Sequence, residues 1–294
     1  MKRSRRVSTA SPSATIAMST RTHELRAAGV DVISLVPGEP DLPVPAHAID
    51  ATVASLGRGE TRYPPLAGIP ALRTAAAEML SRCHGVDFGA RDVVVTVGGK
   101  LAIYNTLQAL VDAGDEVLIL APHWVSYPAQ VQLAGGTPVL VPLSADGGFT
   151  LDDDALARIE AAVTPRTVGL ILNNPNNPTG AVYGADALGW LGDLAERHDF
   201  WLLSDDIYSE LTYDDAEFTS VLRERPALRD RVILVHGVAK SYAMTGYRVG
   251  FLAGPPALVS DALLLQGQET SGATTFAQHG ALAALTGDQS FLAG

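Results

Sequence analysis

Lys240 is the residue of this sequence whose type could do the most distinctive chemistry. It lies in the stretch HGVAKSYAMTGYRVG (236–250), in a chain that has three lysines and eighteen arginines. A lysine can lose its proton and form an imine with an aldehyde, whereas an arginine stays protonated. Because arginine supplies most of the positive charge, we interpret Lys240 as a candidate for amine chemistry. A solvated surface lysine is the alternative.

Three further stretches with unusual residues each follow a short apolar run. Gly98-Gly99 could form a phosphate cradle at the start of a helix, or a plain strand-to-helix turn. The run NPNNPTG (174–180) contains two Asn-Pro pairs, more than a turn requires. Asp205 follows WLL and is either a functional carboxylate or a helix cap. Neither a P-loop nor a Gly-x-Gly-x-x-Gly pattern follows a strand, so neither ATP nor NAD is an expected ligand.

The apolar runs that precede these residues predict the fold. They are short, rich in β-branched residues and separated by stretches with helical spacing, which indicates an α/β fold: a three-layer sandwich with a mainly parallel sheet. The stretch 100–114 predicts a helix that is capped by Gly114. Ligands of such sheets lie beyond the carboxyl ends of the strands. The predicted strands are 92–97, 116–121, 137–143, 167–173, 200–205, 231–237 and 248–254.

Pyridoxal phosphate requires the residue types found at these strand ends. Its aldehyde needs a lysine amine, its ring nitrogen a carboxylate, its phosphate a helix N-terminus and its ring an apolar or aromatic wall. Lys240, Asp205, Gly98-Gly99 and Trp124 could fill these roles in that order. For Trp124 alone, a core tryptophan is an equal alternative.

Eight segments of the chain resemble the class I aminotransferases, in particular the bacterial aspartate aminotransferase subgroup. They occur in the family's order from residue 12 to about residue 285. The segments are PSATIAM, VPGEPD, TRYPPLAGIPALR, VTVGGKLAIYN, PHWVSYP, NNPNNPTGAVY, SDDIYSEL and VAKSYAMTGYRVG. The resemblance implies transfer of an amino group from an L-amino acid to a 2-oxo acid such as 2-oxoglutarate.

The resemblance also implies roles for individual residues. Lys240 matches the lysine that holds the cofactor covalently and moves the substrate's α-proton, and Asp205 matches the partner of the ring nitrogen. Asn177 and Tyr208 match donors to the ring's phenolic oxygen. The other implied cofactor contacts are Trp124 stacked on the ring and Gly99, Lys100 and Arg248 at the phosphate.

The substrate contacts that the resemblance implies are Gly38, Trp124, Asn177 and Lys100. A lysine at position 100 can reach the distal carboxylate of the substrate, which favours aspartate or another acidic donor. Tyr63 matches a tyrosine that reaches the neighbouring subunit's phosphate, so a homodimer is expected. Gly237, Ala239 and the second aspartate of SDD depart from the usual residues of the family.

The same resemblance divides the chain into regions. Residues 1–45 match the N-terminal arm and a small-domain segment, and residues 46–294 match the cofactor-binding large domain. The family's C-terminal small-domain segment, with its arginine for the substrate's α-carboxylate, has no match, since Arg248 is the last arginine. We therefore expect a truncated chain whose last helix, 274–287, exposes apolar surface that the small domain covers in the family.

Bulk composition narrows the remaining possibilities. The net charge of −11 argues against a nucleic-acid partner, and no apolar run is long enough to cross a membrane. One cysteine fits the cytoplasm, and no metal-ligand spacing appears among the seven histidines. Two alternatives to an aminotransferase stay open. One is another pyridoxal-phosphate reaction, such as that of a β-lyase or a synthase, and the other is a cofactor-binding chain without turnover.

Overall fold

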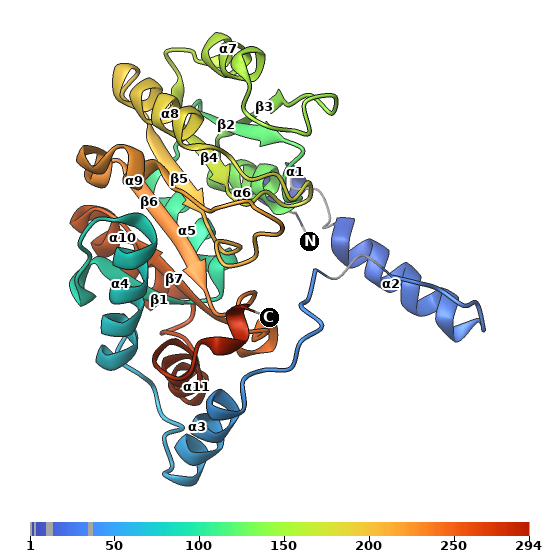
Figure 1. The fold of residues 1–294 in the computed structure, drawn as a ribbon, viewed down its shortest axis with the longest axis vertical. Helices are drawn as coiled ribbons and strands as arrows, with labels where there is room; N and C mark the ends of the chain where they lie inside the picture. The colour runs from blue at the N-terminus through green and yellow to red at the C-terminus, as the bar shows by residue number, and fades with distance from the viewer. Residues whose placement is uncertain (1, 3, 10–13, 35–37, 294) are drawn as a thin grey trace.

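The computed structural model describes residues 2, 4–9, 14–34 and 38–293. Residues 12–13 and 36–37 of the quoted segments lie outside this part. A seven-stranded sheet with the order β1-β7-β6-β5-β4-β2-β3 forms the centre of the molecule (Figure 1). The strands are β1 (Val93–Val97), β2 (Glu116–Ala121), β3 (Thr137–Pro142), β4 (Thr167–Asn173), β5 (Trp201–Asp205), β6 (Val232–Gly237) and β7 (Val249–Ala253). All seven predicted strands are confirmed within one residue at each end.

Strand directions decide which residues share an edge of this sheet. β2, β3, β4, β5 and β6 pair in parallel. β7 pairs antiparallel with both β6 and β1, so β1 runs in the same direction as the parallel strands. The end of β1, the ends of β4, β5 and β6, and the start of β7 therefore all lie at one edge.

Helices cover both faces of the sheet, which gives the predicted three layers. One face packs against α4, α7, α8, α9 and α11, and the other against α5, α6 and α10. The helices are α1 (Arg5–Thr9), α2 (Ala14–Ala27), α3 (Ala46–Gly57), α4 (Pro70–His84), α5 (Gly99–Leu110), α6 (Ser126–Ala134), α7 (Asp153–Ala162), α8 (Ala185–Arg197), α9 (Val221–Glu224), α10 (Pro256–Glu269) and α11 (Thr275–Thr286), with short 3-10 turns at Ala90–Asp92, Pro226–Asp230, Thr245–Tyr247 and Ser290–Ala293.

The inner strands consist of apolar residues because both of their faces are buried. Alternate residues of β5 enter opposite layers: Leu202 packs in the α4 layer and Leu203 in the α5 layer. This alternation continues through the end of the strand. Ser204 and Asp206 therefore belong to the α4 side, and Asp205 belongs to the α5 side.

Two details of the predicted helices were wrong. α5 ends at Leu110 with Val111 as its cap, and Gly114 lies beyond it, at φ +105° in the turn before β2. The apolar run continues past Leu110, but Val111 is already extended (φ −122°, ψ 124°). The last helix is also not exposed as expected. α11 packs against α3 and α4, and Ala277, Ala281, Ala284 and Leu285 are buried.

The N-terminal segment differs from the rest of the fold. Figure 1 shows α2 standing away from the helices that cover the sheet, and residues 38–45 then run back towards α3 without regular structure. In the described part of the chain, none of the helices is long and apolar enough to span a membrane.

Candidate active site

Asp205 lies at the last position of β5, between the ends of β4 and β6. Its Cα is in register with Asn173 on one side and Val235 on the other. The Tyr127 hydroxyl donates to Asp205 Oδ2 at 2.6 Å, and Asn173 Nδ2 donates to the Asp205 carbonyl at 2.7 Å. Burial raises the pKa of Asp205 to about 6, although the bond from Tyr127, the Ile207 amide and nearby Lys240 each favour the charged form. Asp205 begins no helix, so the capping alternative does not apply.

Asn177 and Tyr208 are hydrogen-bonded to each other close to Asp205. Asn177 Nδ2 donates to the Tyr208 hydroxyl at 3.1 Å, and the Asn177 amide nitrogen donates to Asn173 Oδ1 at 2.7 Å. Asn173 therefore fixes both the Asp205 backbone and the Asn-Pro turn. Burial, and then the charge of Asp205, raise the pKa of Tyr208 to about 12, so its hydroxyl remains a hydrogen-bond donor at neutral pH.

Lys240 follows β6 by three residues and points into the same region. Its Nζ donates to the Gly38 carbonyl oxygen and lies 5.7 Å from the centre of the Tyr208 ring. Burial lowers the pKa of Lys240, with Glu39 opposing this and Arg248 adding to it. Burial and the charge of Arg248 both increase the fraction of Lys240 that is a free amine, which is the nucleophilic and basic form.

A cradle without side chains forms at the start of α5. Gly98 has φ +74°, and a Cβ there would lie 2.6 Å from Arg248 Nη2. A Cβ on Gly250 would lie 2.3 Å from the Gly99 nitrogen. The Arg248 guanidinium thus stands beside the first turn of a 12-residue helix, where backbone amides lack intrahelical acceptors. Together these groups offer backbone donors and one cation, which is the chemistry of a candidate anion site.

The close approach of Gly250 and Gly99 leads to a stability prediction. Gly250→Ala is expected to lower the free energy of unfolding by about 1–3 kcal/mol, because backbone atoms on both sides must shift. Denaturant unfolding measures this. The matched control is Gly246→Ala, whose added Cβ would meet no atom within 4 Å. Equal losses in the two variants would contradict the cradle geometry.

Lys100 and Trp124 lie together at the mouth of this region. Lys100 Nζ is 4.8 Å from the centre of the Trp124 ring, and that ring meets Tyr127 edge-on at 5.3 Å. Burial and Arg248 lower the pKa of Lys100. Tyr63 lies apart from this group: it is 88% exposed and lines a cleft formed by residues 61–64 and 270–276.

Three residues at this edge were not predicted from the sequence. Tyr127 and Asn173 hold Asp205, and Asn173 also holds Asn177. His236 lies near the end of β6, four residues before Lys240. Its Nε2 donates to Ser209 Oγ at 2.9 Å, and its Nδ1 accepts from the Gly237 amide at 2.8 Å. The signal was present in the sequence, since Asn173 and His236 are polar residues at the ends of apolar strands and Tyr127 follows Trp124 by three.

His236 predicts a loss of stability in acid. Burial lowers its pKa from 6.5 to about 4. The stabilisation is therefore present above pH 6.5 and is lost as the pH falls towards 4, because the unfolded chain binds the proton first. Between pH 7 and 4, the wild type should lose about 3 kcal/mol more unfolding free energy than His236→Gln. Denaturant unfolding across this pH range tests it, and the exposed His198→Gln variant should match the wild type.

Comparison with known proteins identifies the family. The model for aminotransferase class I and II matches residues 30–293. The chain belongs to the class I and II aminotransferases. A probable aspartate/prephenate aminotransferase of Thermus aquaticus is 44% identical over 290 residues, which are 99% of this chain and 74% of that protein. The aspartate aminotransferase of Geobacillus stearothermophilus is 42% identical over 98% of this chain and 73% of its own length.

Solved aminotransferase structures share the fold. The Thermus thermophilus aspartate aminotransferase with maleate has a TM-score of 0.92 at 44% identity. The match covers 97% of this chain and 73% of the Thermus thermophilus chain. The aspartate aminotransferase of Rhizobium meliloti has a TM-score of 0.94 at 37% identity. The sheet of this aminotransferase is thus the core of the pyridoxal-phosphate-dependent transferase fold, and the family as a whole depends on that cofactor.

Proposed function

We propose that this aminotransferase binds pyridoxal phosphate at the edge formed by Asp205, Lys240 and the start of α5. The carrying observation is that an amine, a buried carboxylate and an anion cradle meet there although 141 residues separate Gly99 from Lys240 in the sequence. The fit is chemical. The cradle would be filled by a Cβ at Gly98 or Gly250, Arg248 adds the phosphate's counter-charge, and Asp205 is an acceptor for a protonated ring nitrogen.

The remaining site residues follow from their positions around these three groups. Asn177 and the protonated Tyr208 present donors for the phenolic oxygen, and Trp124 presents a ring face beside Tyr127. Gly99 and Lys100 supply backbone amides at the first turn of α5. Residues 46–294 form the cofactor-binding domain in this proposal, and residues 1–45 form an arm that brings Gly38 onto Lys240.

When bound, the cofactor supplies an electron sink for a bond broken at the substrate's Cα. The chain's own residues do the rest. Asp205 keeps its negative charge through the bond from Tyr127 and so holds the ring nitrogen protonated. Once free, Lys240 Nζ is the base that takes the α-proton and carries it, since its lowered pKa favours the amine.

The substrate class that we propose is an acidic L-amino acid such as aspartate, with 2-oxoglutarate as the acceptor. Lys100 supports this, because its ammonium group over Trp124 lies at the mouth of the site, where a distal carboxylate would meet it. We propose a homodimer in which Tyr63, 88% exposed, reaches the partner's phosphate, and a cytoplasmic location that suits the free Cys83.

An absorption spectrum with added pyridoxal phosphate tests the function. We expect a visible band from the lysine-bound cofactor, which L-aspartate bleaches. Release of ammonia, pyruvate and the β-substituent from an amino acid with a leaving group on Cβ, without bleaching by L-aspartate, would favour the lyase alternative. A band that no amino acid changes would overturn the proposal of amino transfer but would still support the proposal of cofactor binding.

The substrate class has its own prediction. Lys100→Met should slow the half-reaction with aspartate roughly tenfold or more, because a charge-assisted bond is lost, and should leave the half-reaction with alanine unchanged. Single-turnover rates measure both, with Lys2→Met as the control. Equal losses for both amino acids would show that Lys100 acts on the cofactor and not on the distal carboxylate.

A further inference from the structure

A second buried carboxyl lies directly behind Asp205. Asp206 is 1% exposed, and it belongs to the α4 side of the sheet, where His84, the last residue of α4, is fully buried. Ser204 Oγ donates to Asp206 Oδ1 at 2.8 Å. Asp206 Oδ2 and both ring nitrogens of His84 have no hydrogen-bond partner among the described residues, and Oδ2 faces His84 Nε2 at 3.8 Å. The mechanism above uses neither residue.

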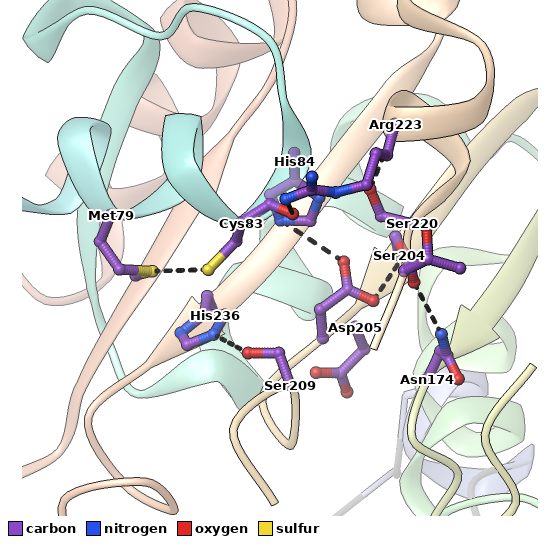
Figure 2. A network of polar contacts seen from close by, with 12 residues as sticks. Met79, Cys83, His84, Asn174, Ser204, Asp205, Ser209, Ser220, Arg223 and His236 are labelled. Atoms are coloured by element: carbon purple, nitrogen blue, oxygen red, sulfur yellow. Dashed lines mark hydrogen bonds and ion pairs between the residues drawn. The ribbon is translucent and has the colours of Figure 1, made fainter. Parts of the chain in front are cut away.

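The charged and titratable groups around this pair do not supply a cation for Asp206. Figure 2 shows the network of polar contacts around His84, which includes Ser204, Ser209, Arg223 and His236. Arg223 donates to the carbonyl oxygens of Arg82 and Cys83, at 2.8 and 3.0 Å. His236 carries its proton on Nε2, towards Ser209, because its Nδ1 accepts from a backbone amide.

The remaining neighbours are apolar or anionic. The Phe218 ring meets His84 edge-on at 6.1 Å. The Cys83 thiol lies 3.8 Å from the Glu210 carboxylate, and burial raises the thiol's pKa to about 12. Asp205 is the adjacent residue. An ionised Asp206 would therefore place a second buried negative charge next to Asp205 without a counter-ion, which is costly.

An imidazolium at His84 is equally unfavourable. A protonated ring beside an ionised Asp206 would be a fully buried ion pair with 3.8 Å between Nε2 and Oδ2, and the desolvation of two charges is costly for so long a contact. A neutral imidazole and a neutral carboxyl avoid both buried charges and leave one bond to make, from the carboxyl O–H to Nε2 across the 3.8 Å between Oδ2 and Nε2.

We propose that Asp206 and His84 form a neutral buried pair. Asp206 stays protonated, and its O–H donates a hydrogen bond to His84 Nε2. Asp206 is then a positioning residue: it leaves Asp205 as the only carboxylate charge at the end of β5. Burial acts in the same direction on both groups, raising the pKa of Asp206 and lowering that of His84 to about 3. The link to Asp205 rests on the proposed function, but the protonation of the pair does not.

Infrared spectroscopy of the cofactor-free protein at neutral pH tests the protonation. The wild type should show a carbonyl stretching band of a protonated carboxyl that Asp206→Asn removes. The matched control is Asp92→Asn, because Asp92 is also buried but pairs with Arg229 at 2.8 Å, and its loss should remove no such band. Absence of a band that depends on Asp206 would overturn the proposal.

If Asp206→Asn does not fold, the protonation of the pair can still be measured in the wild type. In the ¹⁵N spectrum of labelled histidine, His84 should be neutral with its proton on Nδ1, while buried His236 should be neutral with its proton on Nε2. Two non-titrating rings of opposite tautomer support the pair. A buried ring with both nitrogens protonated, or two rings with the proton on Nε2, would mean that Asp206 is a carboxylate.

The positioning role has a separate readout. The titration midpoint of Asp205, followed through its carboxylate band, should be the same in the wild type and in Asp206→Asn, because one neutral group replaces another. If Asp206 carried a charge in the wild type, its removal would lower that midpoint. These measurements need no bound cofactor, so their failure is distinguishable from failure of the proposed function.

Discussion

Replacing Lys240 with alanine is expected to remove the visible cofactor band and to lower the turnover of aspartate by about 10⁴-fold or more. The same amine is assigned two tasks, holding the cofactor and moving the α-proton, and no other lysine is placed to take over. Lys100 is occupied at the Trp124 ring, and Lys2 lies in the N-terminal segment. Spectra and single-turnover rates check the two tasks separately.

Lys240→Arg is the sharper companion variant. It keeps a positive charge near Gly38 but has no amine that can lose its proton at neutral pH, so it should be as inactive as the alanine variant. Lys2→Ala should retain the band and the rate. If Lys240→Arg kept measurable turnover, the lysine would serve the site by its charge, and the assignment of the base would be wrong.

Asp205→Asn is expected to lower the rate of the half-reaction with aspartate by about 10²–10³-fold while the fold is retained. The amide is nearly isosteric and can still accept from Tyr127, so the loss reports the missing charge at the ring nitrogen. Circular dichroism and rates on the same sample check this. Tyr127→Phe serves as the comparison, since it keeps the charge but raises the pKa of Asp205 by removing a stabilising bond.

The pH profile distinguishes these two variants. In Tyr127→Phe, the acid limb of the rate should move to higher pH, because Asp205 then takes up a proton more readily. Asp205→Asn should lose that limb altogether. A Tyr127→Phe profile that matched the wild type would show that the hydrogen bond does not tune the carboxylate.

The sequence was sufficient to predict the strands and the convergence of Gly98-Gly99, Asp205 and Lys240 at one edge of the sheet. Continuous β-branched runs identify buried strands, and a polar or glycine residue at or within four residues of the end of such a run marks the candidate site, as at Gly99, Asn177 and Asp205. Family motifs supplied the pairing of Asn177 with Tyr208, since 31 residues separate the two and no local pattern links them.

Contacts across the sheet could not be predicted in the same way. The bond from Tyr127 to Asp205 joins residues 78 apart and depends on how α6 packs on the α5 side. The pairing of His84 with Asp206 depends on the last turn of α4 meeting the far side of β5. The covering of α11 by α3 was missed because helix-on-helix packing depends on side-chain shape over two faces, which periodicity does not specify.

The reversed direction of β7 has a mechanical consequence. Because β7 starts at the edge where β6 ends, the loop between them is short and carries Lys240 at one end and Arg248 at the other. At the end of the loop, the Arg248 guanidinium donates to the Thr245 carbonyl at 2.8 Å. In the proposed function, the group that would bind the aldehyde and the group that would bind the phosphate are thus eight positions apart on one loop. An insertion or deletion between them is expected to change the length of the molecule that the proposed site accepts.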